Sequence, residues 1–393
     1  MIARGCHGPP QALESFDLTP SGAYDELFVE VNSGSVDHMV NRRGVSVSVI
    51  VAVALSVSAF AQKKDDKNDK KQTDEQKREI QTAVKLADDA AAGQPAVNDL
   101  GVAWAHEDFM KAQGNKEYAP FTVTIDPTKV TAGTVTFYWR AVSKNAPPSA
   151  PVADAKDAKK DEKKGTPKRQ EYAYEDVGFV AVTPGQTAPL RITRSLTVPA
   201  GPYDVYVAVK EPTPPAKNAP PPKASVIKQA VTVPDFWNGE LTTSSVIIAQ
   251  RIDPLPAPLT SQQQAERPYA LGGLEIVPVT ELKMAKKAEL QTFMIIYNPK
   301  TDSMNKPDVT VEYNFYAKAS GAEKFFNKTT PQALNAQTLP PQFDVSAGHQ
   351  LQAGQGVPLA SFPEGEYRLE IVVTDKIAQK SLTRDVNFTV SGS

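Results

Sequence analysis

The chain has 393 residues and a formal net charge of -2, so no global charge draws it to nucleic acid or to an anionic membrane. Hydrophobic residues make up 40% of the sequence, aromatic residues make up 8%, and there are 33 prolines. This length and composition favour a loop-rich, all-β protein with two ordinary domains over a helical bundle.

A secretory signal peptide is predicted for residues 39–61. It has the three parts of such a peptide: a basic start at Arg42 and Arg43, an apolar core over residues 45–60, and a cleavage motif of Ala59 and Ala61 ahead of Gln62. The alternatives are a buried strand or a short membrane anchor. The core is slightly short for a span, and the small residues at its end favour cleavage. A signal peptide begins near the N-terminus of its protein. We therefore expect translation to start at Met39, with residues 1–38 an extension that comes from a start site placed too early.

Cleavage after Ala61 would remove Cys6, the only cysteine. The mature chain would then be close to neutral and would contain neither a thiol nor a disulfide. Such a chain fits the periplasm or the exterior of a bacterium, where disulfides are allowed but not required. The predicted localisation is therefore secreted, periplasmic or cell-surface, with no membrane span after signal cleavage.

A charged tether and a short helix are predicted for residues 62–99. The tether is almost all charge of both signs, which cannot bury apolar area. Thr73 and Gln76 have the spacing of a capping box. The apolar residues that follow would share one helical face: Ile80, Val84, Ala87 and Ala91. This helix either docks on the first domain or extends the tether.

Hydrophobicity of period two begins at Phe121 and predicts a first β-sandwich over residues 100–236. Its strands are expected at Phe121–Ile125, Thr134–Val142, Glu175–Val182, Leu190–Val198, Tyr203–Lys210 and Val226–Val233. Alternation in the second of these strands places Trp139 in the core and Tyr138 outward. Two segments rich in Pro, Lys and Ala, residues 144–170 and 211–225, are predicted to be disordered loops at one end of this sandwich.

A second β-sandwich is predicted over residues 237–393. Its strands are expected at Ser244–Ile252, Leu274–Val279, Leu290–Asn298, Val309–Ala317, Tyr367–Thr374 and Val386–Val390. Ser261 and Gln264 have the spacing to cap a single helical turn between the first two strands.

The two predicted sandwiches repeat one pattern. The run GPYDVYVAVKE and the run GEYRLEIVVTD each place a glycine two residues before a tyrosine, at Gly201 and Tyr203 and again at Gly365 and Tyr367. Aligning the two tyrosines also aligns the strands upstream and downstream. We therefore expect two tandem copies of one antiparallel sandwich, with loop insertions of different lengths.

Each Gly-x-Tyr resembles the tyrosine corner of immunoglobulin-like domains, in which a tyrosine at the start of strand F bonds to nearby backbone. Val205 and Leu369 stand where disulfide-bonded members have cysteine, so the resemblance implies an apolar contact there. Both runs also resemble a strand of fibronectin type III domains. Taken whole, the chain resembles uncharacterised secreted bacterial proteins with tandem sandwich modules, which implies export and β architecture and no particular activity.

No catalytic constellation or cofactor motif is found in the sequence. His106-Glu107 begins like a zinc-protease helix, but Met110 stands where the second histidine is needed. His349 lies in a turn-rich run and is expected to be a surface loop residue. Gly354 and Gly356 are too few for a dinucleotide fingerprint, and their expected place is a hairpin between strands. We therefore predict no catalytic site, no metal site and no cofactor.

Aromatic residues offer another route to function. A candidate binding surface consists of Tyr138, Tyr172, Tyr174 and Trp237, which could stack on sugars or peptides. The structural alternative is favoured, with Trp237 packing between the two sandwiches.

The sequence thus favours an exported, non-catalytic binding or scaffold protein that acts through loops or sheet edges. A self-assembling surface or fibre subunit is the first alternative, and a polysaccharide-binding or polysaccharide-active protein is the second. The expected partner is another exported protein, a second copy of the chain, or cell-wall glycan.

Overall fold

A computed structural model of the protein describes residues 72–145, 172–215, 219–257, 259–279, 281–319 and 321–392. Three predictions concern segments outside these ranges: the extension at 1–38, the signal peptide with its cleavage residues Ala59, Ala61 and Gln62, and nearly all of the loop at 144–170. The described residues are mostly β-strand in antiparallel sheets, which confirms the all-β fold class.

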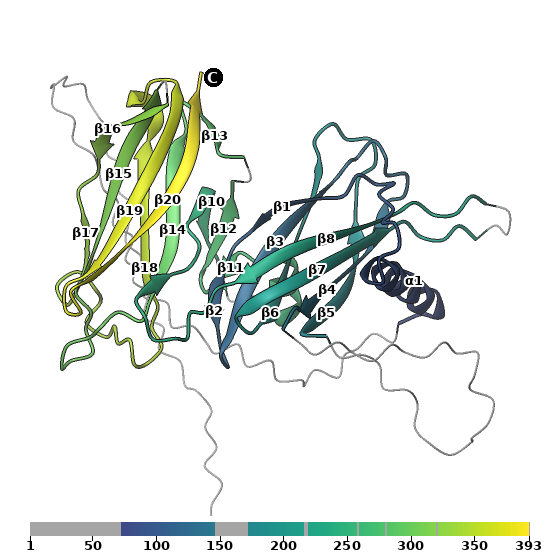
Figure 1. The fold of residues 1–393 in the computed structure, drawn as a ribbon, viewed down its shortest axis with the longest axis horizontal. Coiled ribbons are helices and arrows are strands. Elements are labelled where there is room, and N and C mark those ends of the chain that lie inside the picture. The colour runs from purple at the N-terminus through teal and green to yellow at the C-terminus, as the bar shows by residue number, and fades with distance from the viewer. Residues whose placement is uncertain are drawn as a thin grey trace, which may run out of the picture. The chain divides into compact units, whose positions relative to one another are not determined.

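The first half of the described chain forms two four-stranded sheets (Figure 1). One sheet contains β1 (Ala103–Glu107), β2 (Met110–Ala112), β3 (Lys116–Ile125) and β6 (Leu190–Val198). The other contains β4 (Thr134–Ser143), β5 (Tyr174–Ala181), β7 (Gly201–Lys210) and β8 (Ala224–Val233). Its strand order is β5-β4-β7-β8, whereas β3 pairs with all three other strands of the first sheet.

The second half forms two six-stranded sheets. One contains β9 (Thr242–Thr243), β10 (Ile247–Pro254), β11 (Ala270–Leu271), β12 (Leu274–Pro278), β14 (Glu289–Tyr297) and β18 (Leu351–Pro358). The other contains β13 (Lys283–Ala285), β15 (Val309–Ala319), β16 (Ala322–Lys328), β17 (Gln332–Leu334), β19 (Gly365–Asp375) and β20 (Lys380–Ser391). Strand β13 runs parallel to β20 at the edge of this second sheet, and a 3₁₀ turn, η1 (Leu359–Ser361), follows β18.

The two halves share their strand order. The order β5-β4-β7-β8 in the first half corresponds to β16-β15-β19-β20 in the second. On the facing sheets, β1-β3-β6 corresponds to β10-β14-β18. In each half the inward residues of both sheets form one buried apolar cluster. That of the first half contains the expected core residues Val135, Phe137 and Trp139.

Both tyrosines of the repeated motif are buried and make the expected backbone hydrogen bond. The hydroxyl of Tyr203 donates to the carbonyl of Pro199, and that of Tyr367 donates to the carbonyl of Pro363, both at 2.8 Å. The glycines that precede them have φ angles of 141° and 152°, which L side chains rarely adopt. The motif therefore holds the start of β7 and of β19 by the same geometry.

Helix α1 (Asp74–Ala91) begins at the predicted capping box, since Thr73 and Gln76 exchange side-chain and backbone hydrogen bonds. It docks on the first half, against the outer face of the sheet that contains β4 and β7 (Figure 1). The face that it buries runs through Glu79, Ala83 and Ala87 at four-residue spacing. Ala91 is exposed, so the predicted face was displaced slightly around the helix.

Two predicted details differ from the structure. The short helix α2 (Ser261–Glu266) is capped by Thr260 with Gln263, one residue earlier than Ser261 with Gln264. Gly354 lies inside strand β18 and not in a hairpin. A side chain at Gly354 would bring a Cβ within 2.5 Å of the carbonyl oxygen of Thr292, so the close pairing of β18 with β14 requires glycine there.

We predict that each tyrosine corner stabilises its own half. Tyr203→Phe and Tyr367→Phe should each lower the free energy of unfolding by about 1 kcal/mol, because each removes a partly buried hydrogen bond to a proline carbonyl. Equilibrium urea unfolding measures this. Tyr316→Phe is the control, since the Tyr316 hydroxyl makes only a longer hydrogen bond, 3.3 Å, to Glu370 on the solvent-facing side of β15. Losses below about 0.5 kcal/mol at both corners, within the range of ordinary surface changes, would contradict the assignment.

We also predict that the buried pair of Lys210 and Glu79 fastens α1 to the sheet. Lys210→Met should lower stability by about 3 kcal/mol, because it leaves a buried carboxylate unpaired. The double variant with Glu79→Leu should regain most of that loss. Lys85→Met, which breaks an exposed pair with Asp89 on the same helix, is the matched control and should cost less than about 0.5 kcal/mol. Equal losses for Lys210→Met and Lys85→Met would refute the fastening.

Candidate functional site

The outer face of β4 and β7 in the first half is covered by α1 and cannot contact a partner while the helix is docked. Tyr138, Tyr206 and Ala208 form an apolar cluster with Ala83 and Ala87 of the helix. The buried Arg140 guanidinium pairs with Asp88 and donates to the carbonyl of Ala87. Although burial pushes the pKa of Glu79 upward, hydrogen bonds from Lys210 and Thr213 outweigh it and leave that pKa lowered.

The corresponding face of the second half, on β16-β15-β19-β20, is solvent-facing. We call it the open face. Arg368 on β19 lies at its centre, and its guanidinium contacts Glu323 at 2.8 Å, Glu370 at 3.1 Å and Asp385 at 2.6 Å. These carboxylates come from β16, β19 and β20. They fix one guanidinium across three strands, so this part of the surface is preorganised.

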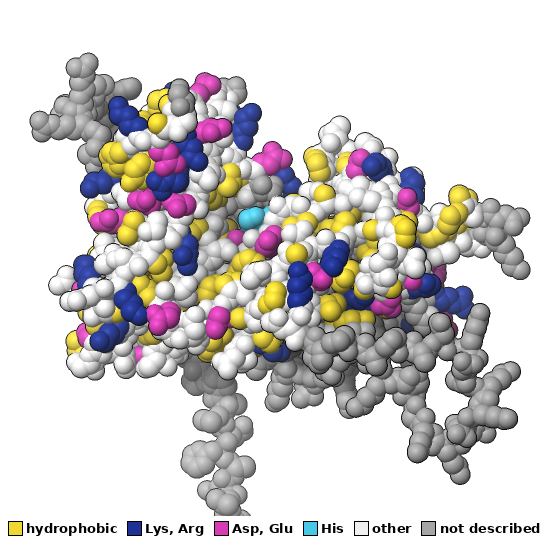
Figure 2. All heavy atoms as spheres, in the orientation of Figure 1, with side chains coloured by type: hydrophobic (Ala, Val, Ile, Leu, Met, Phe, Trp, Pro, Cys, Tyr) yellow, Lys and Arg dark blue, Asp and Glu magenta, His cyan; other side chains and the backbone are white. Residues whose placement is uncertain are grey.

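Aromatic rings continue this arrangement toward the sheet edge. The Arg368 guanidinium lies 4.4 Å from the centre of the Tyr316 ring, and Tyr316 meets Phe325 edge-on at 5.8 Å. Phe325 is 52% exposed although it is fully apolar. Figure 2 shows acidic and basic side chains crowded together with apolar ones over these strands. This part of the open face therefore combines one exposed aromatic ring with a cluster of paired charges.

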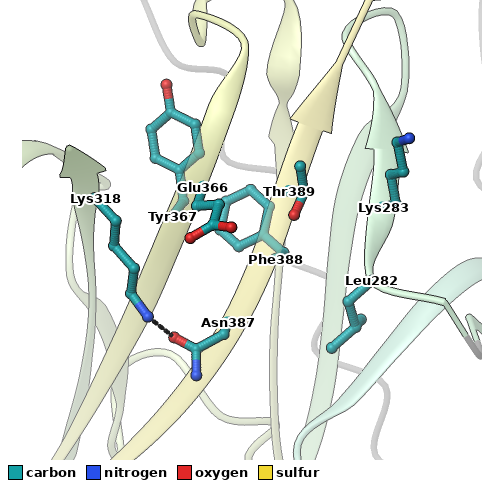
Figure 3. A pocket seen from close by; sticks show the side chains of 8 residues that line it. All are labelled: Leu282, Lys283, Lys318, Glu366, Tyr367, Asn387, Phe388 and Thr389. Carbon is teal, nitrogen blue, oxygen red and sulfur yellow. Dashed lines mark hydrogen bonds between the residues drawn. The ribbon is translucent and has the colours of Figure 1, made fainter. Parts of the chain in front are cut away.

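Two shallow polar hollows lie at the end of the open face where β19 begins. The first, of about 410 Å³, is lined by Leu282, Lys283, Lys318, Glu366, Tyr367, Asn387, Phe388 and Thr389 (Figure 3). The second, of about 310 Å³, shares Lys318 and Glu366 with it and adds Gly321, Ala322 and Glu323. Lys318 donates to the side-chain oxygen of Asn387 at 2.7 Å, and the Glu366 carboxylate lies beside this pair in Figure 3. The hollows can accept a charged side chain but do not enclose a small molecule.

The aromatic residues predicted as a binding surface do not form one. Tyr138 lies on the face opposite Trp139, as alternation predicts, but it is only 1% exposed because α1 covers that face. Tyr174 packs with Trp139 against the core, at 6.4 Å between ring centres. Tyr172 lies over the Arg140 guanidinium at 4.3 Å and donates to Asp88.

Trp237 is 40% exposed and lies at the join between the halves. Its indole N–H donates to the carbonyl of Lys116 at 3.0 Å, and the Lys111 ammonium lies 4.0 Å from its ring centre. These contacts link Trp237 to the hairpin of β2 and β3 in the first half. The ring is therefore held by the first half while its own segment leads into the second.

A further apolar cluster closes the join. It is formed by Phe236, Ile247, Ala249, Tyr269, Ile276, Phe293, Ile295 and Tyr297, with Phe109 of the first half packed against it. Across the join, the backbone N–H of Ser245 donates to the carbonyl of Phe109, and the backbone N–H of Phe109 donates to the Ser245 hydroxyl. The Tyr297 hydroxyl accepts from the backbone N–H of Lys111. The join therefore has an apolar interior and directional bonds.

Two buried carboxylates complete the join. Asp108 accepts from the Tyr269 hydroxyl at 2.6 Å and contacts His106 at 2.9 Å, and the hydrogen bond to Asp108 raises the pKa of His106. Glu117 is fully buried and accepts from the backbone of Phe236, but its second oxygen has no partner among the described residues. Burial raises the pKa of Glu117 to about 7.

The histidines do not form a metal site in the part of the chain that the structure describes, where no group of three or more His, Cys, Asp or Glu side chains is placed to hold an ion. His106 belongs to the join. His349 accepts a hydrogen bond from the backbone of Asp344 and lies partly buried beside Phe343. Neither described helix has the length and apolar character that a membrane span requires.

Comparison with known proteins does not identify a family. No family model matches the sequence, and no curated protein matches it. A family 123 glycoside hydrolase from Clostridium perfringens is 14% identical over 39% of this chain and 28% of its own, with a TM-score of 0.21. Latent PorU from Porphyromonas gingivalis is 10% identical over 78% of this chain and 21% of its own, with a TM-score of 0.26. Trypsin-activated alpha-2-macroglobulin from Escherichia coli is 10% identical over 76% of this chain and 17% of its own, with a TM-score of 0.20.

The chain thus spans at most 28% of the length of these three structures. At such TM-scores the matches carry no argument about function.

We predict that Glu117 makes the stability of the join depend on pH. Its folded-state pKa of about 7 exceeds the ordinary value of 4.5, so the folded state holds the proton more tightly. This stabilisation is complete below about pH 4.5 and is lost as the pH rises through about 7. Between about pH 4.5 and pH 7, the free energy of unfolding of the parent chain should therefore fall by about 2–3 kcal/mol more than that of Glu117→Gln.

Thermal unfolding between pH 4 and pH 8.5 measures this difference. Glu289→Gln, an exposed substitution on β14, is the control and should track the parent chain at every pH. Parallel curves for Glu117→Gln and the parent would show that the carboxyl is ionised in the folded state at neutral pH.

Proposed function

We propose that the chain is an exported, non-catalytic binding or scaffold protein built from two tandem immunoglobulin-like sandwiches. The strand order β5-β4-β7-β8 facing β1-β3-β6 supports an immunoglobulin-like assignment, and the second half repeats both orders. The two tyrosine corners support it further. The signal-peptide pattern at residues 39–61 supports export to the periplasm, the cell surface or the exterior.

The observation that carries the binding role is the contrast between the two copies. The same sheet face is covered by α1 in the first half and left facing solvent in the second. The open face combines an exposed phenylalanine with a fixed network of charges, and the closed apolar join holds both halves as a frame for it. A fixed surface of this kind supports recognition, and the apolar packing of the described residues at the join disfavours a polysaccharide cleft there.

Self-assembly is the second candidate, because β16 lies at the end of its strand order and carries Phe325. An edge strand with an exposed aromatic residue can pair with another chain. A second copy of this protein would then be the partner.

Crosslinking mass spectrometry on intact cells tests the function, using a tag after Ser393 and a lysine-reactive crosslinker. We expect one stoichiometric protein partner, with crosslinks concentrated at Lys318, Lys324 and Lys328 on β15 and β16. Lys85 and Lys228 of the first half serve as internal controls. Crosslinks only between copies of the chain would replace this proposal with self-assembly. Recovery with cell-wall glycan and no protein would overturn both.

A further inference from the structure

The covered face of the first half shows what this type of sheet surface accepts. An 18-residue helix lies on it through the small residues Ala83 and Ala87. Its acidic side chains Glu79 and Asp88 pair with the basic Lys210 and Arg140 of the sheet. The docked face of α1 therefore combines small apolar residues with acidic side chains that pair with basic side chains of the sheet.

The register of the strands identifies the same positions in the second half. Ser143 pairs with Tyr203, and Ala317 pairs with Tyr367, so the two pairs correspond. Counting back along β4 and β15 then places Asn314 where the first half has Arg140, and Glu312 where it has Tyr138. Both groups that bind the acidic residues of α1 are missing, because Lys210 corresponds to Thr374. A helix like α1 therefore does not fit the open face.

The charge of the open face is reversed. Five carboxylates point from it: Glu312, Glu323, Glu366, Glu370 and Asp385. Three of them are occupied by Arg368. Glu312 and Glu366, by contrast, have no ion-pair partner within the described ranges, and Glu366 borders both hollows. Lys318 faces Glu366 across the paired strands and lies 3.8 Å from Glu323, so the face sets five carboxylates against the two cations Arg368 and Lys318 and keeps an acidic excess.

The spacing of Glu312 and Glu366 sets the size of the partner. They lie six residues apart across the paired strands, since Glu312 faces Val372 and Glu366 is six residues before Val372. At about 3.3 Å per strand residue this is about 20 Å. An α-helix covers that length in about 13 residues. Tyr316 and Phe325 lie between these ends and can receive apolar side chains.

From these observations, and resting on the proposed binding function, we propose that the open face binds a basic amphipathic helix of a partner protein. Lysine or arginine side chains near the two ends of the helix pair with Glu312 and Glu366. Its apolar side packs on Tyr316 and Phe325. The arrangement is the counterpart of α1 on the first half, with the charges exchanged between helix and sheet.

A peptide with the α1 sequence tests the proposal directly. The basic probe has all five acidic residues of α1 replaced by lysine, and the matched control is the unmodified 18-residue sequence. Because Cys6 is the only cysteine, a Cys6→Ser background accepts single reporters. A dye at Thr383→Cys reports on the open face, and a dye at Thr232→Cys on β8 reports on the first half.

We expect a saturable fluorescence change at position 383 with the basic probe, none at position 232, and at least tenfold weaker binding of the unmodified peptide. Glu312→Gln combined with Glu366→Gln should weaken the basic probe by about fivefold, the effect of two exposed ion pairs. Glu289→Gln on β14 should leave binding unchanged. Raising the salt concentration should weaken binding, since exposed charges are screened.

Equal binding of both peptides, or no saturation by about 1 mM, would overturn the proposal. A signal at position 383 that depends on protein concentration without peptide would assign the face to a second copy. A signal that changes on deletion of residues 146–171 alone would assign it to the chain's own loop. If the probe fails while crosslinking in cells still recovers a partner, the binding function stands and only this assignment of the face is lost.

Discussion

Burial of one sheet on both faces is the constraint on which the first half depends. The central strands β4 and β7 face the core on one side and α1 on the other, so Arg140 and Lys210 are removed from water although each carries a charge. Burying a charge is costly unless a partner of opposite charge and further hydrogen bonds accompany it. Asp88 and Glu79 of α1 supply those partners. The helix is therefore part of the folded unit, because its loss would expose an apolar cluster and leave two cations without their partners.

The join couples the halves by a similar combination of apolar packing and buried polar groups. Phe109 of the first half packs against a cluster that otherwise belongs to the second, while Asp108 and Glu117 are buried nearby with hydrogen bonds that reach Tyr269 and Phe236. Such bonds are directional, so they select one relative placement of the connecting segments where apolar contact alone would allow several. Burial raises the pKa of Glu117, so under mildly acidic conditions its carboxyl is neutral while it holds the backbone of Phe236 in place.

Hydrophobic alternation and capping residues predicted the strands and the helix that have such signals in their own sequence. They missed elements that form only because a neighbouring strand pairs with them. The alternation of β6 yielded its full span, Leu190–Val198, and the capping box located the start of α1. Strand β18 has glycines and few β-branched residues, and it forms because β14 accepts it. Alternation also placed Tyr138 on the outer face, but it cannot show what covers that face. A signal existed: residues 205–209 are apolar without interruption, as expected of a strand buried on both sides. The Arg368 network joins three strands and leaves no local pattern at all.

The difference between the two halves follows from the kind of side chains on the outer face of each. A face that carries Tyr138, Tyr206 and Ala208 would expose a continuous apolar surface, so the first copy requires a covering element. The second copy has Glu312, Glu370 and Val372 at these positions, and its carboxylates remain hydrated without one. Both halves have the tyrosine corner and the same strand order, because these features determine how the sheets are built and not which side chains lie on the outer face. The same strand order can thus carry an outer face that α1 covers and an outer face that is stable while it faces solvent. Stability while empty is the physical requirement for a surface that binds a separate partner reversibly.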